Sequence, residues 1–301
     1  MAAIELEGIE KSYGSIEVLK GVTFSVEKGE IYGVLGPNGA GKTTTFRIIL
    51  GLLRQDSGSI AVDGDKHQNS KKIRRKIGYL PADVNFYEDM TARQNLRYFS
   101  DLADTDPDFE ELLELAGISE DADRNVSGFS TGMKKRLGIA QSLVKDPEII
   151  IYDEPTTGLD PEGKRKFRKH VEKINREKGK TVLVSSHITS EIEPLCDRFG
   201  ILHEGVIKAS GTHEELSEGS NETTGVKIHV KNLRKAEEAL GGSPEEIEDE
   251  TKIRDGAVIL ENPDHREQLL QQLLETEAGI KSVEPRKETL EKAYLRITGD
   301  A

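Results

Sequence analysis

The sequence is poor in cysteine, tryptophan and long apolar runs, and these shortages exclude several classes of protein. The single cysteine, Cys196, cannot form a disulfide within the chain and has no His or Cys neighbour at metal-ligand spacing, so we expect an inert buried thiol. The longest apolar runs are strand-sized, well short of the roughly 18 to 20 residues of a membrane-spanning helix. Residues 1–11 carry glutamates where a secretory signal has a basic start and an apolar core. We therefore expect a cytoplasmic protein without membrane spans.

Basic residues are also in deficit, with 42 Lys and Arg against 55 Asp and Glu and a net charge of −13. Binding to nucleic acid is driven by an excess of positive charge, so this balance predicts no nucleic-acid partner. A hydrophobic content of 35% over 301 residues is sufficient for one large domain or two ordinary ones with buried cores.

A phosphate-binding pattern stands between an expected strand and an expected helix. Residues 31–35 are a short apolar run typical of a buried strand, and residues 44–53 have apolar side chains at helical spacing. Between them lies the pattern GxxxxGK[ST], whose glycines let backbone N–H groups surround phosphates at a helix start. Lys42 would reach the β- and γ-phosphates, and the Thr43 hydroxyl would hold Mg²⁺. The nucleotide-binding residues expected here are Gly36, Pro37, Asn38, Gly39, Ala40, Gly41, Lys42, Thr43 and Thr44.

A second buried strand is expected to supply carboxylates. Residues 149–152 are three isoleucines and a tyrosine, and Asp153 and Glu154 follow at the strand's C-terminal end, where a parallel sheet presents ligand-binding groups. Asp153 is expected to bind Mg²⁺ through water. Glu154 points elsewhere by strand alternation and is expected to accept a proton from the water that attacks the γ-phosphate. An acidic pair at a strand end is by itself equally typical of a solvated turn.

The segment between these two motifs contains a second helix start. Lys42 and Asp153 are 111 positions apart, which is more than a simple strand-helix repeat needs. Within this insert, residues 129–133 form a loop with Ser and Gly ahead of helical apolar spacing at 134–144. The pattern predicts a second anion-binding helix start in the same chain.

Residues 1–215 resemble the ATP-binding cassette (ABC) family, with the family's motifs in the family's order. The resemblance implies an α/β P-loop ATPase core with a helical subdomain and an antiparallel β subdomain, which uses ATP and Mg²⁺ and couples ATP hydrolysis to transport. Besides the phosphate loop it rests on Lys11 to Gly14, Phe129 to Met133, Asp153 with Glu154, Gly158 to Asp160, and Ser185 to His187.

The resemblance also implies roles for single residues. Tyr13 matches the family's adenine-stacking aromatic, His187 its γ-phosphate sensor, and Asp160 its dimer-contacting loop. Ser130 and the Gly132 amide would contact the γ-phosphate of ATP bound by a second subunit, so that ATP joins two chains head to tail. Hydrolysis would remove those contacts and open the pair. We therefore expect a homodimer that drives an integral membrane permease and lies, through it, at the inner face of the cell membrane.

Two positions depart from the family pattern. Thr131 replaces a glycine of the signature loop, with little expected effect because Gly132 remains for close approach. Ala82 stands where the family has a Gln or Glu that touches Mg²⁺, so we expect weaker metal coupling at this loop. Asp83, one residue further on, would supply that metal contact only if the loop shifts register.

Aromatic residues gather beside this loop, since residues 79–99 contain five of the chain's 15 Tyr and Phe. By resemblance this segment borders the groove that receives a cytoplasmic helix of the permease, and aromatic anchors suit such a groove. The alternative for about half of these rings is packing within the helical subdomain, which is expected at about residues 86–145.

The pattern changes after residue 217. The ATPase domain is expected to span 1–217 and a second domain 222–301, where the order strand-helix-strand-strand-helix-strand predicts a small α+β ferredoxin-like fold. Residues 289–295 resemble the ending of ATPase subunits from the drug- and polysaccharide-exporter branch, where this extension helps subunits pair. We expect a dimerising or regulatory domain, and an exporter.

Two alternatives stay open. A soluble ABC ATPase acting on ribosomes or DNA conflicts with the single cassette, the acidic balance and the lack of a long coiled coil between Lys42 and Asp153. Residues 78–87 also resemble the ATPase subunit that serves copper-site maturation of nitrous-oxide reductase. The transported substrate is not encoded, because the ATPase subunit does not touch it.

Overall fold

The computed structural model describes residues 2–66, 70–217, 226–240, 251–254, 257–260, 266–285 and 289–299. By its internal contacts the chain divides into two compact units, Met1–His213 with Tyr294–Ala301 and Glu214–Ala293. The first unit holds the phosphate loop and the other motifs between Lys11 and His187 on which the resemblance to the ABC family rests. The end of the last helix groups with this unit, whereas the sequence places it in a domain spanning 222–301.

An antiparallel sheet opens the first unit, with the strand order β2-β1-β4-β5. Alternating apolar residues such as Ile4 and Leu6 point into the core. A tight turn containing Gly14, at φ 59°, joins the first two strands. The predicted antiparallel β subdomain is confirmed, and its strands are β1 (Ala2–Tyr13), β2 (Ile16–Glu27), β4 (Ser57–Val62) and β5 (Asp65–Lys66).

A six-stranded sheet carries the candidate site, with the order β10-β9-β3-β8-β7-β6. Its neighbouring strands are parallel except for β10, which is antiparallel to β9. Three central strands are buried along their whole length, so their C-terminal ends present the following loops at one edge of the sheet. The strands are β3 (Ile31–Leu35), β6 (Ile77–Leu80), β7 (Ile149–Tyr152), β8 (Thr181–Ser186), β9 (Arg198–His203) and β10 (Val206–Gly211).

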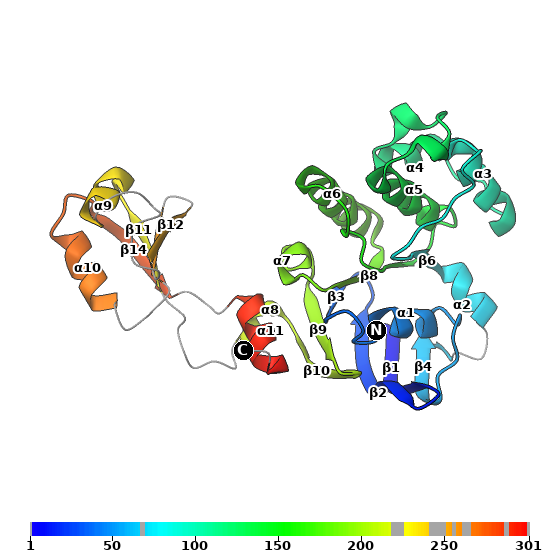
Figure 1. Ribbon diagram of the computed structural model, residues 1–301, viewed down its shortest axis with the longest axis horizontal. Coiled ribbons are helices and arrows are strands. Elements are labelled where there is room, and N and C mark those ends of the chain that lie inside the picture. Colours follow the sequence, from blue (N-terminus) through cyan, green and yellow to red (C-terminus); the bar gives the residue numbers. More distant parts are fainter. Residues whose placement is uncertain are drawn as a thin grey trace. The chain divides into compact units, whose positions relative to one another are not determined.

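Helix α1 (Lys42–Ile49) lies between the two sheets (Figure 1). Its Phe46, Ile48 and Ile49 belong to a core that includes residues from both sheets, which fixes the loop before it at the sheet edge. Within the described ranges no helix combines the length and apolarity that a membrane crossing requires. The other helices outside the helical subdomain and before β11 are α2 (Ser70–Lys76), α6 (Pro161–Lys178), α7 (Thr189–Ile192) and α8 (His213–Ser217).

A helical subdomain fills the insert between β6 and β7 (Figure 1). Thr91 caps its first helix with a capping box completed by Gln94, and Asp108 caps the second. The third helix packs on the loop after β6 at Gly138, where a Cβ would lie 2.5 Å from Leu80 Cδ1. These elements are α3 (Ala92–Ala103), α4 (Phe109–Ala116) and α5 (Thr131–Leu143), with the 3-10 turns η1 (Ser119–Asp121) and η2 (Val126–Gly128).

The second unit has the predicted ferredoxin-like topology, an antiparallel sheet in the order β12-β13-β11-β14. Its described core is apolar and includes Val226, Ile228 and Leu273. The sequence order of its elements is the predicted one: β11 (Val226–Val230), α9 (Leu233–Ala239), β12 (Thr251–Arg254), β13 (Ala257–Leu260), α10 (Arg266–Leu274) and β14 (Ile280–Pro285). Helix α11 (Leu290–Thr298) then ends the described chain.

Candidate nucleotide site

The loop between β3 and α1 folds as a cradle because two of its glycines leave no room for a side chain. A Cβ on Gly36 would lie 2.2 Å from the carbonyl oxygen of Leu202. Gly41 has φ 109°, and a Cβ there would lie only 2.5 Å from Leu19 Cδ2. Gly41 caps α1 without any side-chain hydrogen bond, so the first N–H groups of the helix face the loop uncapped. Asn38 and Gly39 are exposed at the tip of this cradle.

Lys42 turns back over the cradle from the first position of α1. Its ammonium donates to the carbonyl oxygens of Gly36, at 2.6 Å, and Pro37, at 3.0 Å. The side chain is only 6% exposed, so this cation is held close to the loop and shielded from water. Ala40 is buried beneath it, and Thr44 is half-buried in the first helical turn.

Asp153 is the most buried carboxylate at this edge, with no exposed surface. Each of its oxygens accepts one hydroxyl: Thr43 donates to Oδ2 at 2.7 Å, and Ser185 at the end of β8 donates to Oδ1 at 2.7 Å. Burial, together with the negative charge of Asp153, raises the pKa of the Tyr79 hydroxyl well above its usual range. The structure thus brings Thr43 and Asp153 together, as the sequence predicts.

Three polar groups of Glu154 are hydrogen-bonded, and the fourth, Oε1, is buried without a hydrogen bond beside the Lys42 ammonium. Its carboxylate lies between Lys42, with Nζ 3.1 Å from Oε1, and His187, with Nδ1 2.8 Å from Oε2. Its backbone N–H donates to Ser185 Oγ at 2.9 Å, and its carbonyl accepts from Lys135 Nζ at 2.9 Å. The residue has φ 48°, a left-handed conformation that is unusual for a residue with a Cβ. Lys42, Glu154 and His187 therefore meet at one point.

The other predicted residues do not join this cluster within the described chain. Ser130 caps α5 by accepting from the Met133 N–H at 3.3 Å, and Asp160 caps α6 by accepting from the Gly163 N–H at 2.7 Å. Tyr13 ends β1 with 47% of its surface exposed. Among the described residues, no hydrogen bond joins Ser130, Gly132, Asp160 or Tyr13 to the cradle.

Asp83 lies exposed in the loop after β6. In the described residues no hydrogen bond or ion pair links it to Thr43 or Asp153, and its charge acts instead on the Lys135 ammonium. Burial lowers the pKa of Lys135, against the opposing charges of Asp83, Asp153 and Glu154. A role for Asp83 in binding metal stays a prediction.

Two residues of the cluster were not given a role by the sequence. Ser185 bridges Asp153 and the Glu154 N–H, and its signal is a serine that closes an otherwise apolar strand. Lys135 of α5 is only 4% exposed. The sequence indicates this only indirectly, because Lys135 lies at helical spacing from Ile139 and Ser142 on the buried face of the helix.

Known proteins are similar to this chain in sequence along nearly its whole length. A family model described as ABC transporter matches residues 19–157. The Nod factor export ATP-binding protein I of Burkholderia orbicola is 35% identical over 99% of this chain and 98% of its own length. The linearmycin resistance ATP-binding protein LnrL of Bacillus subtilis is 34% identical over 98% of both chains. The protein belongs to the ATP-binding subunits of ABC transporters. It is accordingly an ATP-binding protein and an ATPase.

Solved structures of ABC cassettes match the first unit's share of the chain. A structure described as the ATP binding subunit of an ABC transporter has a TM-score of 0.66 at 31% identity and covers 72% of this chain and 92% of that one. The dimeric structure of MJ0796, a bacterial ABC transporter cassette, has a TM-score of 0.65 at 28% identity, with 69% and 98% covered. The P-loop fold is therefore confirmed, and the full-length relatives extend through the second unit as well.

Proposed function

We propose that this ATPase drives export, as a head-to-tail dimer that closes around two ATP molecules and acts on a membrane permease encoded as a separate chain. The observation that carries the proposal is that only one of the two predicted phosphate-binding helix starts contributes to the site within a single chain. Lys42, Glu154 and His187 converge beside the cradle, while the second anion-binding helix start, at Ser130, forms no hydrogen bond with it in the described chain. A second copy supplies that helix start, as symmetric pairing allows.

The residues at the cradle fit Mg²⁺, which prefers oxygen ligands. The Thr43 hydroxyl and the Asp153 carboxylate lie 2.7 Å apart, and the carboxylate is buried with no basic residue hydrogen-bonded to it in the described chain. We assign Thr43 as a direct ligand and Asp153 as a ligand through water. When bound, the ion would neutralise charge that develops on the phosphates.

The remaining groups divide the work of hydrolysis. Lys42 and the N–H groups at the start of α1 hold the phosphates, in keeping with a positive helix end. Glu154 accepts the proton of the attacking water, and His187, hydrogen-bonded to Glu154 Oε2, fixes the direction of that carboxylate. Tyr13, at the exposed end of β1, offers its ring to the adenine.

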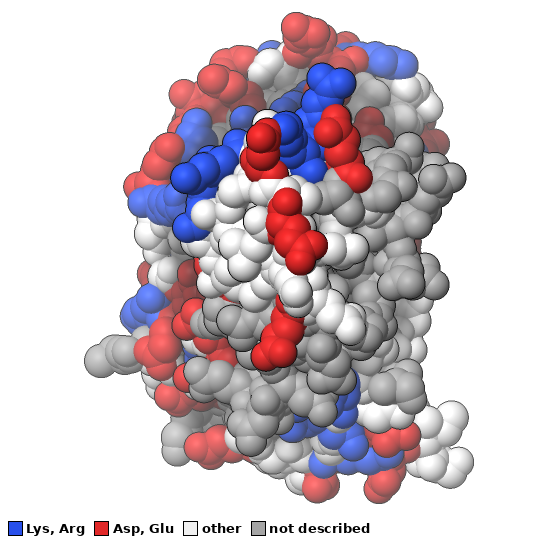
Figure 2. Space-filling view, turned by 90° about the vertical axis from the view of Figure 1, so that its left-hand side faces the viewer, with Lys and Arg blue, Asp and Glu red and all other residues white. Residues whose placement is uncertain are grey.

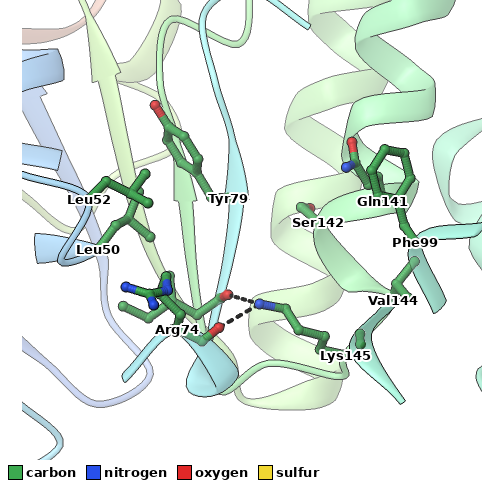
Figure 3. A pocket seen from close by; sticks show the side chains of 11 residues that line it. Leu50, Leu52, Arg74, Tyr79, Phe99, Gln141, Ser142, Val144 and Lys145 are labelled. Carbon is green, nitrogen blue, oxygen red and sulfur yellow. Dashed lines mark hydrogen bonds between the residues drawn. The ribbon is translucent and has the colours of Figure 1, made fainter. Parts of the chain in front are cut away.

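A groove at the C-terminal end of α1 suits the permease. A cavity of about 200 Å³ opens between the end of α1 and the helical subdomain (Figure 3). Leu52, which is 59% exposed, and the rings of Tyr79 and Phe99 give it apolar walls. Lys145 donates to the Arg74 and Ile77 carbonyls and closes one end. We assign this groove to a cytoplasmic helix of the permease.

The aromatic cluster divides between this groove and its own subdomain. Tyr87 and Tyr98 stack edge to face at 4.8 Å, and Phe86 meets Phe99 at 6.3 Å. Most of these rings therefore pack on one another, while Tyr79 and Phe99 also reach the groove. Such a shared arrangement gives a rigid wall for a docking helix.

Relatives support export over the other assignments. Similar proteins include those named for Nod factor export and for bacitracin transport. In Figure 2, basic side chains gather in a band near the top of the face and in a smaller group at its lower edge, with acidic side chains next to both. The net charge of −13 favours no nucleic-acid partner.

Complementation between two inactive variants tests the dimer. Lys42→Met removes the cradle's cation, and Ser130→Asp places a negative charge on the trans helix start. Each variant alone should be inactive, but in a mixed pair one composite site keeps an intact cradle and an intact helix start. Equal mixing should restore about a quarter of wild-type ATPase activity if pairing is random and the sites act independently. A mixture as inactive as its components contradicts the shared site.

A further inference from the structure

Among the described residues, one buried cation beside the site has no role in the chemistry assigned so far. Lys135 is 4% exposed and extends from the second turn of α5 to the carbonyl oxygen of Glu154, 2.9 Å away. A buried ammonium is costly unless it is hydrogen-bonded and faces negative charge. Three carboxylates, of Asp83, Asp153 and Glu154, act on it electrostatically.

The position of this contact in the fold matters more than its strength. The other hydrogen bonds and ion pairs recorded to the backbone N–H and carboxylate of Glu154 come from the nucleotide-binding core: Lys42 from α1, Ser185 from β8, His187 from the loop after it, and the nearby Thr157. Lys135 alone among these partners belongs to the helical subdomain.

The backbone of Glu154 explains why its carbonyl needs a partner. At φ 48° the peptide leaves the strand direction, and a residue with a Cβ holds this conformation only when its surroundings fix it. Ser185 fixes the N–H side of the residue and Lys135 the carbonyl side. If α5 moved away, the carbonyl would lose its side-chain donor and keep only the longer bond from the Thr157 N–H, at 3.3 Å, so the carboxylate would be held less firmly in direction.

We propose that Lys135 is a positioning residue that makes the direction of the Glu154 carboxylate depend on the place of α5. The inference rests on the proposed role of Glu154. Helix α5 also bears Ser130 at its start and borders the groove assigned to the permease through Gln141 and Ser142. Hydrolysis is thereby tied to the position of the subdomain that meets both partners.

The packing around α5 shows how the loop after β6 enters this coupling. Gly138, one turn beyond Lys135, is the point where the side chains of Leu80 and Val84 press against the helix. Asp83 stands between these two residues and faces Lys135 with its charge. The loop therefore contacts α5 by packing at Gly138, and Asp83 adds its charge at Lys135, which itself bonds to the Glu154 carbonyl.

Kinetics on Lys135→Met test the inference, because Met retains the length and volume of the buried side chain without the donor. We expect kcat to fall about tenfold or more while KM and nucleotide affinity stay within about twofold of wild type. Lys169→Met is the matched control. Lys169 is an exposed lysine of α6, and it lines a cavity between α5 and α6 that Lys135 also lines. It should leave kcat and KM unchanged.

Further variants separate the possible failures. Lys135→Gln, which is polar but too short to reach the carbonyl, should repeat the fall in kcat and serves if the Met variant does not fold. An unchanged kcat, or a raised KM with kcat unchanged, overturns the positioning role. Glu154→Gln is measured in parallel: if it too is fully active, the proposed role of Glu154 has failed, whereas if it alone is inactive, only the inference about Lys135 has failed.

Discussion

The two helix starts of the first unit, at α1 and at α5, are built on different plans. Helix α1 begins at Gly41, whose left-handed backbone provides no side-chain cap, and the cluster of Lys42, Asp153 and Glu154 surrounds it. Helix α5 begins at Ser130, which caps its own helix by accepting from the Met133 N–H. The first start has no side-chain cap and has charged side chains of the same chain around it, whereas the second is capped by its own serine.

The largest effect should come from the complete start. Glu154→Gln removes the proton acceptor while retaining the shape of the side chain, so we expect ATPase activity to fall about 10² to 10⁴-fold with ATP binding retained. Phosphate release and nucleotide titration measure the two quantities. Glu162→Gln, at an exposed position in the first turn of α6, is the control and should be fully active. Normal turnover in both variants would show that Glu154 is not the proton acceptor at the α1 start.

The α5 start gives the next effect, and Ser130→Asp separates its two roles. Asp caps a helix as well as Ser and suits the positive helix end, so thermal stability should be unchanged or higher. Opposite a γ-phosphate the same charge is repulsive, and we expect ATPase activity to fall about 100-fold or more. Thr91→Asp makes the corresponding change at the capped start of α3 and should be silent. A fully active Ser130→Asp variant would reduce Ser130 to a cap.

Acid should weaken the contact that holds α6 against the sheet, and should leave both helix starts unchanged. His170 of α6 borders a cavity of about 320 Å³ with Leu115 of α4 and Ile139 of α5, and its Nε2 lies 3.0 Å from the Tyr152 hydroxyl. Burial lowers the pKa of His170 to about 4. As the pH falls below 6.5, His170 is protonated in the unfolded chain but stays neutral in the folded chain, so the free energy of unfolding decreases.

The size of this effect follows from the pKa difference. Between pH 6.5 and 5 the loss should be on the order of 2 kcal/mol in the free energy of unfolding. Urea unfolding of wild type and His170→Gln over this range measures it, since Gln keeps a partner for Tyr152 and does not titrate. The acid-dependent loss should be smaller in the variant by this amount, and equal losses in both proteins would show that His170 is not its cause.

The two starts also differ in how far the sequence predicts them. The cradle and the Asp153 and Glu154 pair follow from spacing and strand-end logic, because a parallel sheet brings its C-terminal ends to one edge whatever the intervening sequence. Ser185 and Lys135 did not follow, because a hydroxyl and an ammonium gain their roles from contacts across the fold that no local pattern records. The pairing of Ser130 with a cradle stays a prediction for the same reason.

In the second unit the order of strands and helices is predictable from the sequence, but the boundary of the unit is not. Its strand and helix order is predictable because each element has its own apolar period, and the observed order β12-β13-β11-β14 is the split βαβ arrangement. The division of the chain was harder to predict, since α11 begins in one compact unit and ends in the other. A helix's period indicates that one face is buried but does not say against which domain.

Substitution of one glycine at each start should change stability in opposite directions. A Cβ on Gly132 would lie in ordinary contact with Leu159 Cδ2, at 3.5 Å, and Ser130 Oγ, at 3.9 Å. Gly132 lies within α5, so Gly132→Ala should raise stability by about 0.5 to 1 kcal/mol. A Cβ on Gly36 would lie 2.2 Å from the Leu202 carbonyl oxygen, so Gly36→Ala should lower stability. Thermal unfolding measures both.

If the Gly132 amide approaches a phosphate in trans, its alanine variant should also hydrolyse ATP more slowly despite being more stable. A more stable variant with full activity would show that the α5 start tolerates bulk and that partner contact lies elsewhere.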